Sequence, residues 1–285
     1  MPIERVSWWE WLARAGYGAR GVVYLSAGVF SLLAAFELHR SAEGAGGALE
    51  TLAGWPFGRL WIAALGAGLA AFVVWRAAQA VLDADQLGAS PKAIVSRLGQ
   101  ALSGAVYAGL AVTAFELLDG LENEGRPSAQ DLLAAPFGAQ LLLLAGLVVA
   151  GCAVGNAVRA FTDDFGGALG CSAAGRRLAE RLARAGYLAR GAAMALVAVF
   201  LVRAALQGDA GEIQTMGQAL QTLERQPFGS WLLAAVAAGL AAFGLFGLIE
   251  ARHRRILAPS ARRAPFRLRR PWSPLRPGTA TSLRA

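Results

Sequence analysis

Long apolar stretches alternate with short polar segments along most of the chain. A helix needs about 20 mostly apolar residues to cross the hydrocarbon core of a bilayer. Six stretches approach or reach this length, at 20–38, 60–82, 98–118, 139–158, 187–206 and 231–249. The pattern therefore predicts six transmembrane helices.

The composition also indicates a membrane protein. Hydrophobic residues make up 56% of the 285-residue chain, charged residues make up 16%, and the mean hydropathy is +0.45. Soluble domains carry about 25% charged residues. The apolar content excludes disorder over most of the chain, and two cysteines, Cys152 and Cys171, do not make a disulfide scaffold.

Two short motifs each recur three times along the chain. The segment 14–21, Arg-Ala-Gly-Tyr-Gly-Ala-Arg-Gly, returns nearly unchanged at 184–191 and in degraded form at 97–104. The tripeptide Pro-Phe-Gly occurs at 56–58, 136–138 and 227–229. Because the order and spacing of both motifs repeat together, they indicate three copies of a two-helix unit.

The repeat predicts the architecture. Each unit crosses the membrane twice, so all units share one orientation, as parallel repeats about an axis along the membrane normal do. We predict an all-α integral membrane protein with six transmembrane helices as three parallel two-helix repeats in a pseudo-threefold bundle; a linear row of hairpins is the alternative. The predicted repeats are 1–82, 83–160 and 161–251, followed by a basic, Pro-rich tail at 252–285 that we expect to be disordered.

The Pro-Phe-Gly motif has a structural interpretation. Proline suits the first turn of a helix, where its missing N–H removes no hydrogen bond. We therefore interpret Pro56, Pro136 and Pro227 as residues that start the second helix of each unit.

The distribution of charge predicts the orientation. If both termini are cytoplasmic, five of the 27 basic residues fall on the outer side: Arg40, Arg59, Arg126, Arg203 and Arg225. The positive-inside rule then favours cytoplasmic N- and C-termini. The excess of Ala, Gly and Arg indicates a bacterial source, and hence the inner membrane. For the basic tail, contact with anionic lipid headgroups is favoured over nucleic acid, because the tail follows a spanning helix.

Three charged residues lie within or beside the predicted spans. Glu116 and Arg203 occupy equivalent repeat positions, and Glu37 lies one turn beyond the counterpart in the first unit. Charges in spans are candidate functional residues. Three interpretations stay open: the side chains extend to the outer surface, the arginine bridges two carboxylates, or the group forms a proton or cation pathway.

The first motif lies near the inner membrane interface and carries arginines in all three units. Lipid phosphates or loop carboxylates are their expected partners. The candidate headgroup or interface anchors are Arg14, Arg20, Arg97, Arg184 and Arg190.

Catalytic patterns are absent from the sequence. His39 and His253 are isolated, Cys152 and Cys171 form no CxxC motif, and no Gly-rich loop follows a strand. We expect no catalytic residue, metal or cofactor, and a non-enzymatic scaffold or a subunit that binds lipid, a membrane-protein partner or a second copy. The alternative is a small transporter or channel with a pathway near Glu37, Glu116 and Arg203.

In combination, the Arg-Ala-Gly-Tyr and Pro-Phe-Gly hairpin repeats resemble an uncharacterised family of bacterial membrane proteins, the domain-of-unknown-function family numbered 1206. The resemblance covers nearly the whole chain except the basic tail. It implies six helices in three tandem units at the cell membrane, and it implies no activity. The middle unit departs from the motif, because Gln100 and Ser103 replace the tyrosine and the second arginine.

Overall fold

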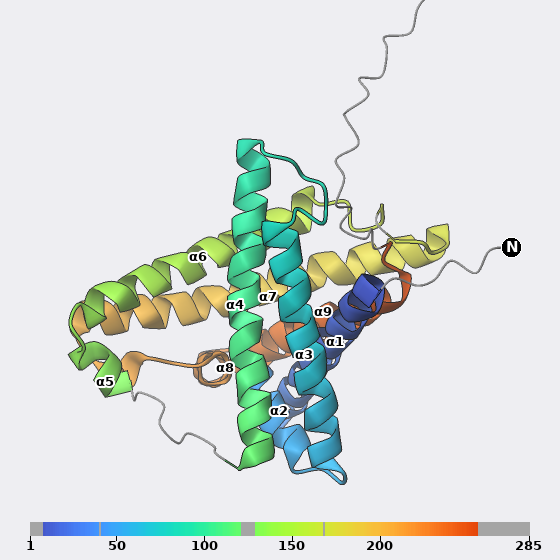
Figure 1. Cartoon of the computed structure of the whole chain (residues 1–285). Helices are drawn as coiled ribbons and strands as arrows, with labels where there is room; N and C mark the ends of the chain where they lie inside the picture. Colours follow the sequence, from blue (N-terminus) through green and yellow to red (C-terminus); the bar gives the residue numbers. More distant parts are fainter. Residues whose placement is uncertain (1–7, 40, 121–128, 168, 256–285) are drawn as a thin grey trace, which may run out of the picture.

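A computed structural model of the chain describes residues 8–39, 41–120, 129–167 and 169–255 (Figure 1). The predicted disorder of the tail falls on residues 256–285, which lie outside the described residues. The described part is helical, and its only β-type pairing is an isolated antiparallel bridge between Leu169 and Arg254. The long helices are α1 (Trp8–Ala35), α3 (Gly58–Val81), α4 (Pro91–Asp119), α6 (Gly138–Thr162), α7 (Ala173–Gln207) and α9 (Gly229–His253).

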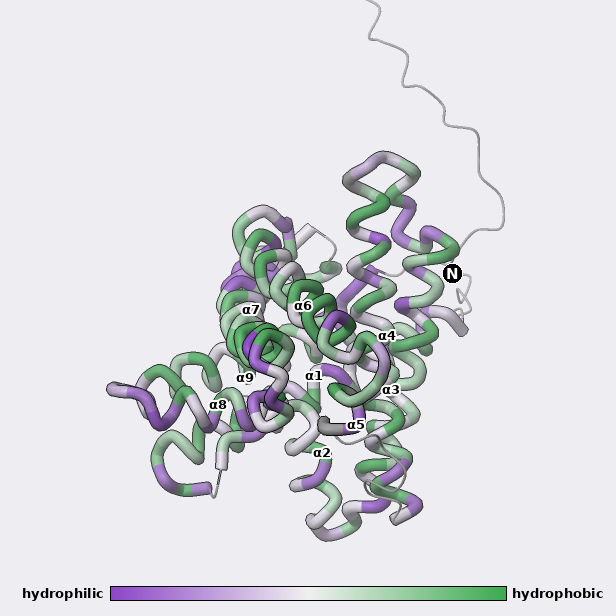
Figure 2. Tube along the Cα trace, turned by 90° about the vertical axis from the view of Figure 1, so that its left-hand side faces the viewer, coloured by the Kyte–Doolittle hydropathy of each residue, from purple (hydrophilic) through white to green (hydrophobic). Residues whose placement is uncertain are grey.

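These six helices confirm the predicted transmembrane segments, because each is long and apolar enough to cross a bilayer. Figure 2 shows hydrophobic residues along the helices and hydrophilic residues mostly near their ends. Several helices extend beyond the apolar stretch. For example, α7 begins at a side-chain cap, where the hydroxyl of Ser172 accepts from the backbone N–H of Gly175, and it ends at Gly208 in the left-handed conformation.

The two long helices of each hairpin are joined by a connection that contains a short helix and the Pro-Phe-Gly motif. The short helices are α2 (Ala45–Ala53), α5 (Ala129–Ala134) and α8 (Met216–Glu224), with the single turn η1 (Ala210–Glu212) before α8. Helices α3, α6 and α9 begin at the glycine of the motif, two residues later than predicted. The proline instead lies in a turn, in which the Gly58 N–H donates to the Trp55 carbonyl at 2.8 Å.

The residue after proline explains this shift. Phe57, Phe137 and Phe228 all have φ of 62°, and proline followed by positive φ is the pattern of a type II turn. The following glycine is required by space: a Cβ on Gly58 would lie 1.9 Å from the Ala53 carbonyl oxygen, and one on Gly229 would lie 1.9 Å from that of Glu224.

The long helices pack in the order α4, α3, α1, α9, α7, α6. Figure 1 shows α3 and α4 running together in one direction, α6 and α7 running together across it, and α1 and α9 between them. The α1–α9 contact is the most extensive in the molecule, and it joins the first and third repeats. It depends on small residues, because a Cβ on Gly28 would lie 2.3 Å from the backbone nitrogen of Ala241.

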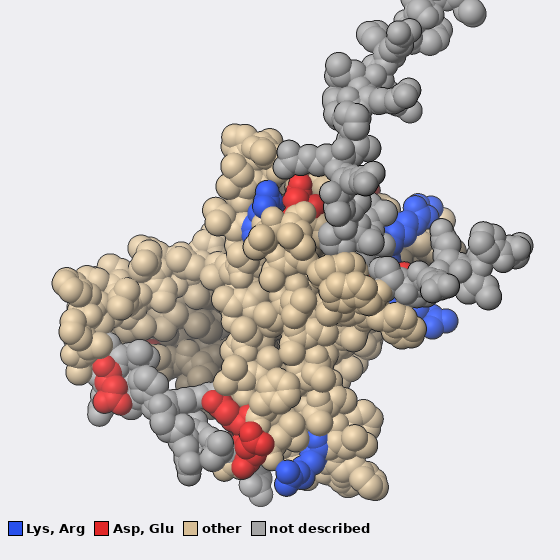
Figure 3. All heavy atoms as spheres, in the orientation of Figure 1, with Lys and Arg blue, Asp and Glu red and all other residues tan. Residues whose placement is uncertain are grey.

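The three hairpins are not packed alike, and the predicted pseudo-threefold bundle is not confirmed. Helices α1 and α3 pack closely in the first hairpin, as α7 and α9 do in the third, whereas α4 and α6 of the second hairpin are not a packed pair. Figure 3 shows the surface hollowed between the arm formed by α5 and α6 and the vertical helix α4. The second hairpin is therefore open.

Candidate functional site

A cluster of arginines and aromatic rings fills the centre of the molecule near one end of the helices. We call this end basal: it is where α1 begins, α9 ends, and the connections 82–90 and 163–172 lie. All six long helices contribute to the cluster or its edge. Its members are Tyr17, Arg20, Tyr24, Phe72, Arg76, Tyr107, Arg159, Tyr187, Arg190, Phe243 and Glu250.

An ion pair between α1 and α9 anchors the cluster. The Arg20 guanidinium donates to the Glu250 carboxylate at 2.5 Å, and the two side chains are 2% and 5% exposed. The guanidinium also lies 4.9 Å from the ring centre of Phe243 and 5.3 Å from that of Phe72. The charges are thus neutralised inside the protein and covered by aromatic faces.

Arg254, just beyond α9, completes this pair from the basal end. Its guanidinium donates to the second oxygen of Glu250 and lies 5.0 Å from the ring centre of Tyr17. Burial lowers the pKa of Arg254, but Tyr17 and the Glu250 carboxylate outweigh it, so that the pKa is raised above its ordinary value. The carboxylate of Glu250 therefore holds two permanently charged guanidinium groups.

A second branch of the cluster connects α3 to α4. Arg76 is buried over the ring of Phe72 at 4.9 Å, and its guanidinium donates to the side-chain oxygen of Gln79 at 3.1 Å. The side-chain amides of Gln79 and Gln100 both donate to Asp85, at 2.7 and 2.9 Å. The carboxylate of Asp85 is thus shared by two amides.

A third branch lies between α6 and α7. The Arg190 guanidinium lies 5.2 Å from the ring centre of Phe243, 5.5 Å from that of Tyr24 and 5.9 Å from that of Tyr107. Arg159 lies 5.0 Å from the ring of Tyr187 and donates to Asp163 at 2.8 Å. In this branch Arg190 has aromatic faces around it but takes part in no ion pair within the described part of the chain.

The arginines predicted as headgroup anchors have several different environments. Arg20 is enclosed with Glu250, a carboxylate of α9, and Arg190 is half-buried among aromatic rings. Arg97 donates to the Ala80 and Val81 carbonyls at 2.8 and 3.1 Å, where α3 ends. Arg184 is exposed.

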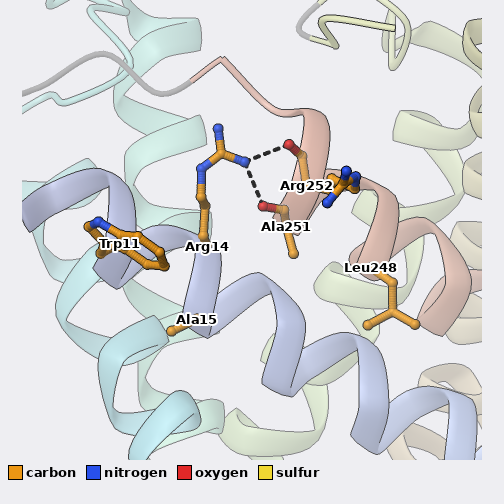
Figure 4. A pocket seen from close by; sticks show the side chains of 6 residues that line it. All are labelled: Trp11, Arg14, Ala15, Leu248, Ala251 and Arg252. Carbon is orange, nitrogen blue, oxygen red and sulfur yellow. Dashed lines mark hydrogen bonds between the residues drawn. The ribbon is translucent and has the colours of Figure 1, made fainter. Parts of the chain in front are cut away.

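Arg14 makes the same kind of contact as Arg97, but with the end of α9. Its guanidinium donates to the carbonyls of Ala251 and Arg252 at 2.8 and 2.6 Å, and to Glu10 (Figure 4). It borders an open pocket of about 440 Å³ between α1 and α9, which Trp11 and Leu248 also line. In the first two units, the first arginine of the motif therefore caps carbonyls at the end of a neighbouring helix, an interaction that favours cations at helix C-termini.

The three charged residues near the outer ends of the first helices lie in separate surroundings. Glu37 is exposed in a turn after α1, with φ of 59°. Glu116 is half-buried in α4 and has an interaction partner. Arg203 pairs with Glu212 of its own hairpin at 3.3 Å, with the arginine side chain 51% exposed. Arg203 therefore has a carboxylate partner other than Glu37 and Glu116, the two that a bridge, one of the three open interpretations, would join.

Sequence reasoning missed Arg76, Arg159 and Glu250 as members of a site. The register of the repeats contains a signal for the last two: counted from Pro-Phe-Gly, Gln79, Arg159 and Glu250 occupy equivalent positions two or three residues before α3, α6 and α9 end. Polar residues at the same position of three apolar helices face a common centre when the hairpins share one packing mode. Within the described residues, no group of three or more His, Cys, Asp or Glu residues could hold a metal ion.

The model of a family described as Domain of Unknown Function (DUF1206) matches residues 15–83, 98–163 and 185–254. The chain belongs to this family. It is also 29% identical over 254 residues to the "Uncharacterized protein YxxB" of Bacillus subtilis (strain 168), a match that covers 87% of this chain and 92% of that protein. No solved structure matches the chain. The three matched segments confirm the tandem two-helix repeats in this DUF1206 protein.

Proposed function

We propose that this protein is a non-enzymatic subunit of the bacterial inner membrane, with both termini in the cytoplasm, that acts as a scaffold for a membrane partner. The close packing of the first and third hairpins is the observation that carries the proposal. A Cβ on Gly16 would lie 2.6 Å from Phe72 Cα, and one on the equivalent Gly186 would lie 2.6 Å from Phe243 Cα. Such contacts make a rigid unit and leave little space for a hydrated path.

The uncovered part of the molecule gives the scaffold a surface for its partner. Leu141, Leu144, Leu147 and Val154 of α6 are all more than half exposed. On the same helix, a Cβ on Gly151 or Gly155 would meet no atom within 4 Å. A spanning helix of a partner could approach this small-residue face closely, which is the usual basis of helix association in lipid.

Photo-crosslinking tests the partner-binding role. A photoreactive residue at Val154 of α6 should crosslink to one discrete membrane protein in cells, while the same residue at the exposed Val74 of α3 should not. Equal crosslinking at both positions, or none at Val154, would reject the scaffold. Removal of residues 259–285 in the same strain shows whether the basic tail contributes to recruitment: recruitment falls if it does and is unchanged if it does not.

A transporter or channel is the second candidate, because Glu116 is a half-buried carboxylate within a spanning helix. Two pockets in the structure, of about 440 and 300 Å³, are lined by other residues. Proton or cation flux into liposomes that contain the purified protein tests this function, with Glu116→Gln as the variant. Flux that the substitution abolishes would favour transport over the scaffold.

A further inference from the structure

The packing of α6 against α7 is an internal copy of the packing of α9 against α1. Counted from the two motifs, Gly191 is equivalent to Gly21, and Ala153 is equivalent to Gly244. A Cβ on Gly21 would lie 2.9 Å from the Gly244 carbonyl oxygen, and one on Gly191 would lie 3.0 Å from the Ala153 carbonyl oxygen. The two interfaces therefore place equivalent residues opposite each other.

The copies differ in charge at one position. In the α9–α1 interface, Arg20 faces the carboxylate of Glu250. Its equivalent in the α6–α7 interface is Arg190, and the residue equivalent to Glu250 is Arg159. The position that holds the carboxylate partner of Arg20 in α9 therefore holds a second arginine, Arg159, in α6.

Arg190 is left without the partner that its copy has. Its Nε is buried without a hydrogen-bond partner, as is that of Arg20, but no carboxylate of the described chain pairs with Arg190 as Glu250 does with Arg20. Three aromatic faces surround Arg190, and cation–π contacts contribute about 2 kcal/mol at a desolvated site. Taking one ion out of water costs several kcal/mol, so the rings alone do not replace an anion.

The other polar groups of this interface do not supply that anion. Asp163 is bonded to Arg159, whose side chain is 50% exposed. The side-chain amide of Asn156 donates to the Cys152 carbonyl at 2.7 Å and contacts the Met194 sulfur at 3.5 Å. Both groups are therefore already engaged, and the interface carries an excess of positive charge.

The open second hairpin gives Arg190 a route to the lipid. The ring centre of Tyr107 of α4 lies 5.9 Å from the Arg190 guanidinium, and Ala153 of α6 lies against the neighbouring Gly191, yet α4 and α6 are not packed together. Arg190 is itself half-buried rather than enclosed. Val148 of α6, which is equivalent to the fully packed Gly68 of α3, is 39% exposed, so the edge of this opening is apolar.

We infer that the opening between α4 and α6 binds an anionic phospholipid, whose phosphate group takes beside Arg190 the place that the Glu250 carboxylate takes beside Arg20. The guanidinium offers parallel N–H donors to the phosphate oxygens. The acyl chains lie along the apolar edge of α4 and α6. An amphiphile fits this arrangement because the cation lies inside the helix bundle, while the walls of the opening are apolar.

Lipid binding to three variants tests the inference. The purified protein is placed in nanodiscs of phosphatidylcholine with or without phosphatidylglycerol, and retained lipid is counted by native mass spectrometry after extraction. Arg190→Gln should weaken retention of phosphatidylglycerol by about tenfold or more, because one charge-assisted contact is lost. Arg184→Gln, on the exposed face of the same helix, should retain it as the unaltered protein does.

The third variant supplies the missing carboxylate from within. Arg159→Glu recreates at α6 the charge of Glu250, and its side chain is exposed enough to tolerate the change. This variant should unfold at a higher temperature in phosphatidylcholine alone and should no longer be stabilised by phosphatidylglycerol. A gain in stability cannot come from misfolding. The Arg159→Glu variant therefore still tests the inference if Arg190→Gln does not fold.

Three results would overturn the inference. The first is equal phosphatidylglycerol retention by the Arg190→Gln and Arg184→Gln variants. The second is a phosphatidylglycerol effect that persists unchanged in Arg159→Glu. The third is full occupation by inorganic phosphate in detergent with no preference for the lipid, which would assign the oxyanion to the cytoplasm instead. None of these results depends on whether the protein recruits a partner, so the scaffold role is tested separately.

Discussion

The first and second hairpins carry the same motifs but pack differently. In the first, the backbone of α3 lies directly against α1 because Gly16 faces Phe72 and Gly68 faces Ala19. In the second, the equivalent residues are Gly99, Cys152, Val148 and Leu102. A glycine and a large ring are complementary, whereas a glycine and a cysteine leave a gap, and a valine in place of Gly68 holds the helices apart. The comparison shows that a duplicated hairpin keeps its turns more readily than its interface.

The most pronounced contrast between the two hairpins should appear in disulfide trapping. In a protein with Cys152→Ala and Cys171→Ala, the pair Ala19→Cys and Gly68→Cys should form a crosslink on mild oxidation. A Cβ on Gly68 would lie 2.5 Å from that of Ala19, so a separation of the two helices by about 1 Å brings the pair to the Cβ–Cβ spacing of a disulfide, about 3.5–4.5 Å.

The equivalent pair in the second hairpin, Leu102→Cys and Val148→Cys, should stay reduced, as judged by the gel mobility of membranes labelled with a thiol reagent. Complete crosslinking of this second pair would show that the hairpin closes in the membrane. That outcome would contradict the open conformation.

The largest energetic effect should come from the ion pair that the closed part contains. Glu250→Gln should lower the free energy of unfolding by about 3–5 kcal/mol, because Arg20 then stays buried without a counter-charge. Denaturant titration in detergent measures the loss. Glu10→Gln is the control: it breaks a pair with Arg14 whose side chains are 26% and 28% exposed, so solvent screens the charges and the loss should be less than about 1 kcal/mol. Similar losses for both variants would mean that burial of the ion pair does not determine how much free energy of unfolding is lost.

Glycine-to-alanine substitutions at equivalent positions should give the next largest difference in stability between the first and second hairpins. Gly16→Ala should destabilise the protein by about 1–3 kcal/mol, because its Cβ would lie 2.6 Å from the backbone of Phe72. Gly99→Ala, at the equivalent position of the second hairpin, meets no atom within 4 Å and should be neutral or stabilising by up to about 1 kcal/mol. A loss of stability in Gly99→Ala would indicate that α4 and α6 do pack.

The smallest effect concerns a feature that the hairpins share. Phe228→Gly should raise the free energy of unfolding by about 0.5–1 kcal/mol, because relief of left-handed strain at this 82% exposed side chain outweighs the higher chain entropy that glycine gives the unfolded state. Thermal unfolding measures the gain. Phe228→Ala keeps the strain and serves as control, so a gain of the same size in this variant would assign the effect to the lost ring.

The position of each span and the turn motif were visible in the sequence because they depend on neighbouring residues. Apolar length predicts a crossing, and three repeats of Pro-Phe-Gly predict three equivalent turns. The detail of the turn was wrong by two residues, since the strain at Phe57, Phe137 and Phe228 has no sequence signal. Phenylalanine is not a residue that favours positive φ.

The environments of the arginines could not be read in the same way. Arg20 and Arg190 occupy the same position of the motif, yet Arg20 pairs with a residue 230 positions away, whereas the residue equivalent to that partner in α6 is an arginine. The apolar pattern shows that an arginine lies near the end of a span, and both lipid headgroups and a buried carboxylate satisfy that observation. Only the pairing of α1 with α9 and of α6 with α7 shows which of these two kinds of partner each arginine has.

By itself the sequence determined six long apolar helices, three tandem units and the approximate place of the three Pro-Phe-Gly turns, because hydropathy and turn chemistry are local properties. The tertiary structure alone decided which helices are neighbours, which hairpin stays open, and which arginines are neutralised. Those outcomes depend on the fit between small and large side chains from distant segments, and on whether a charge meets its opposite across an interface.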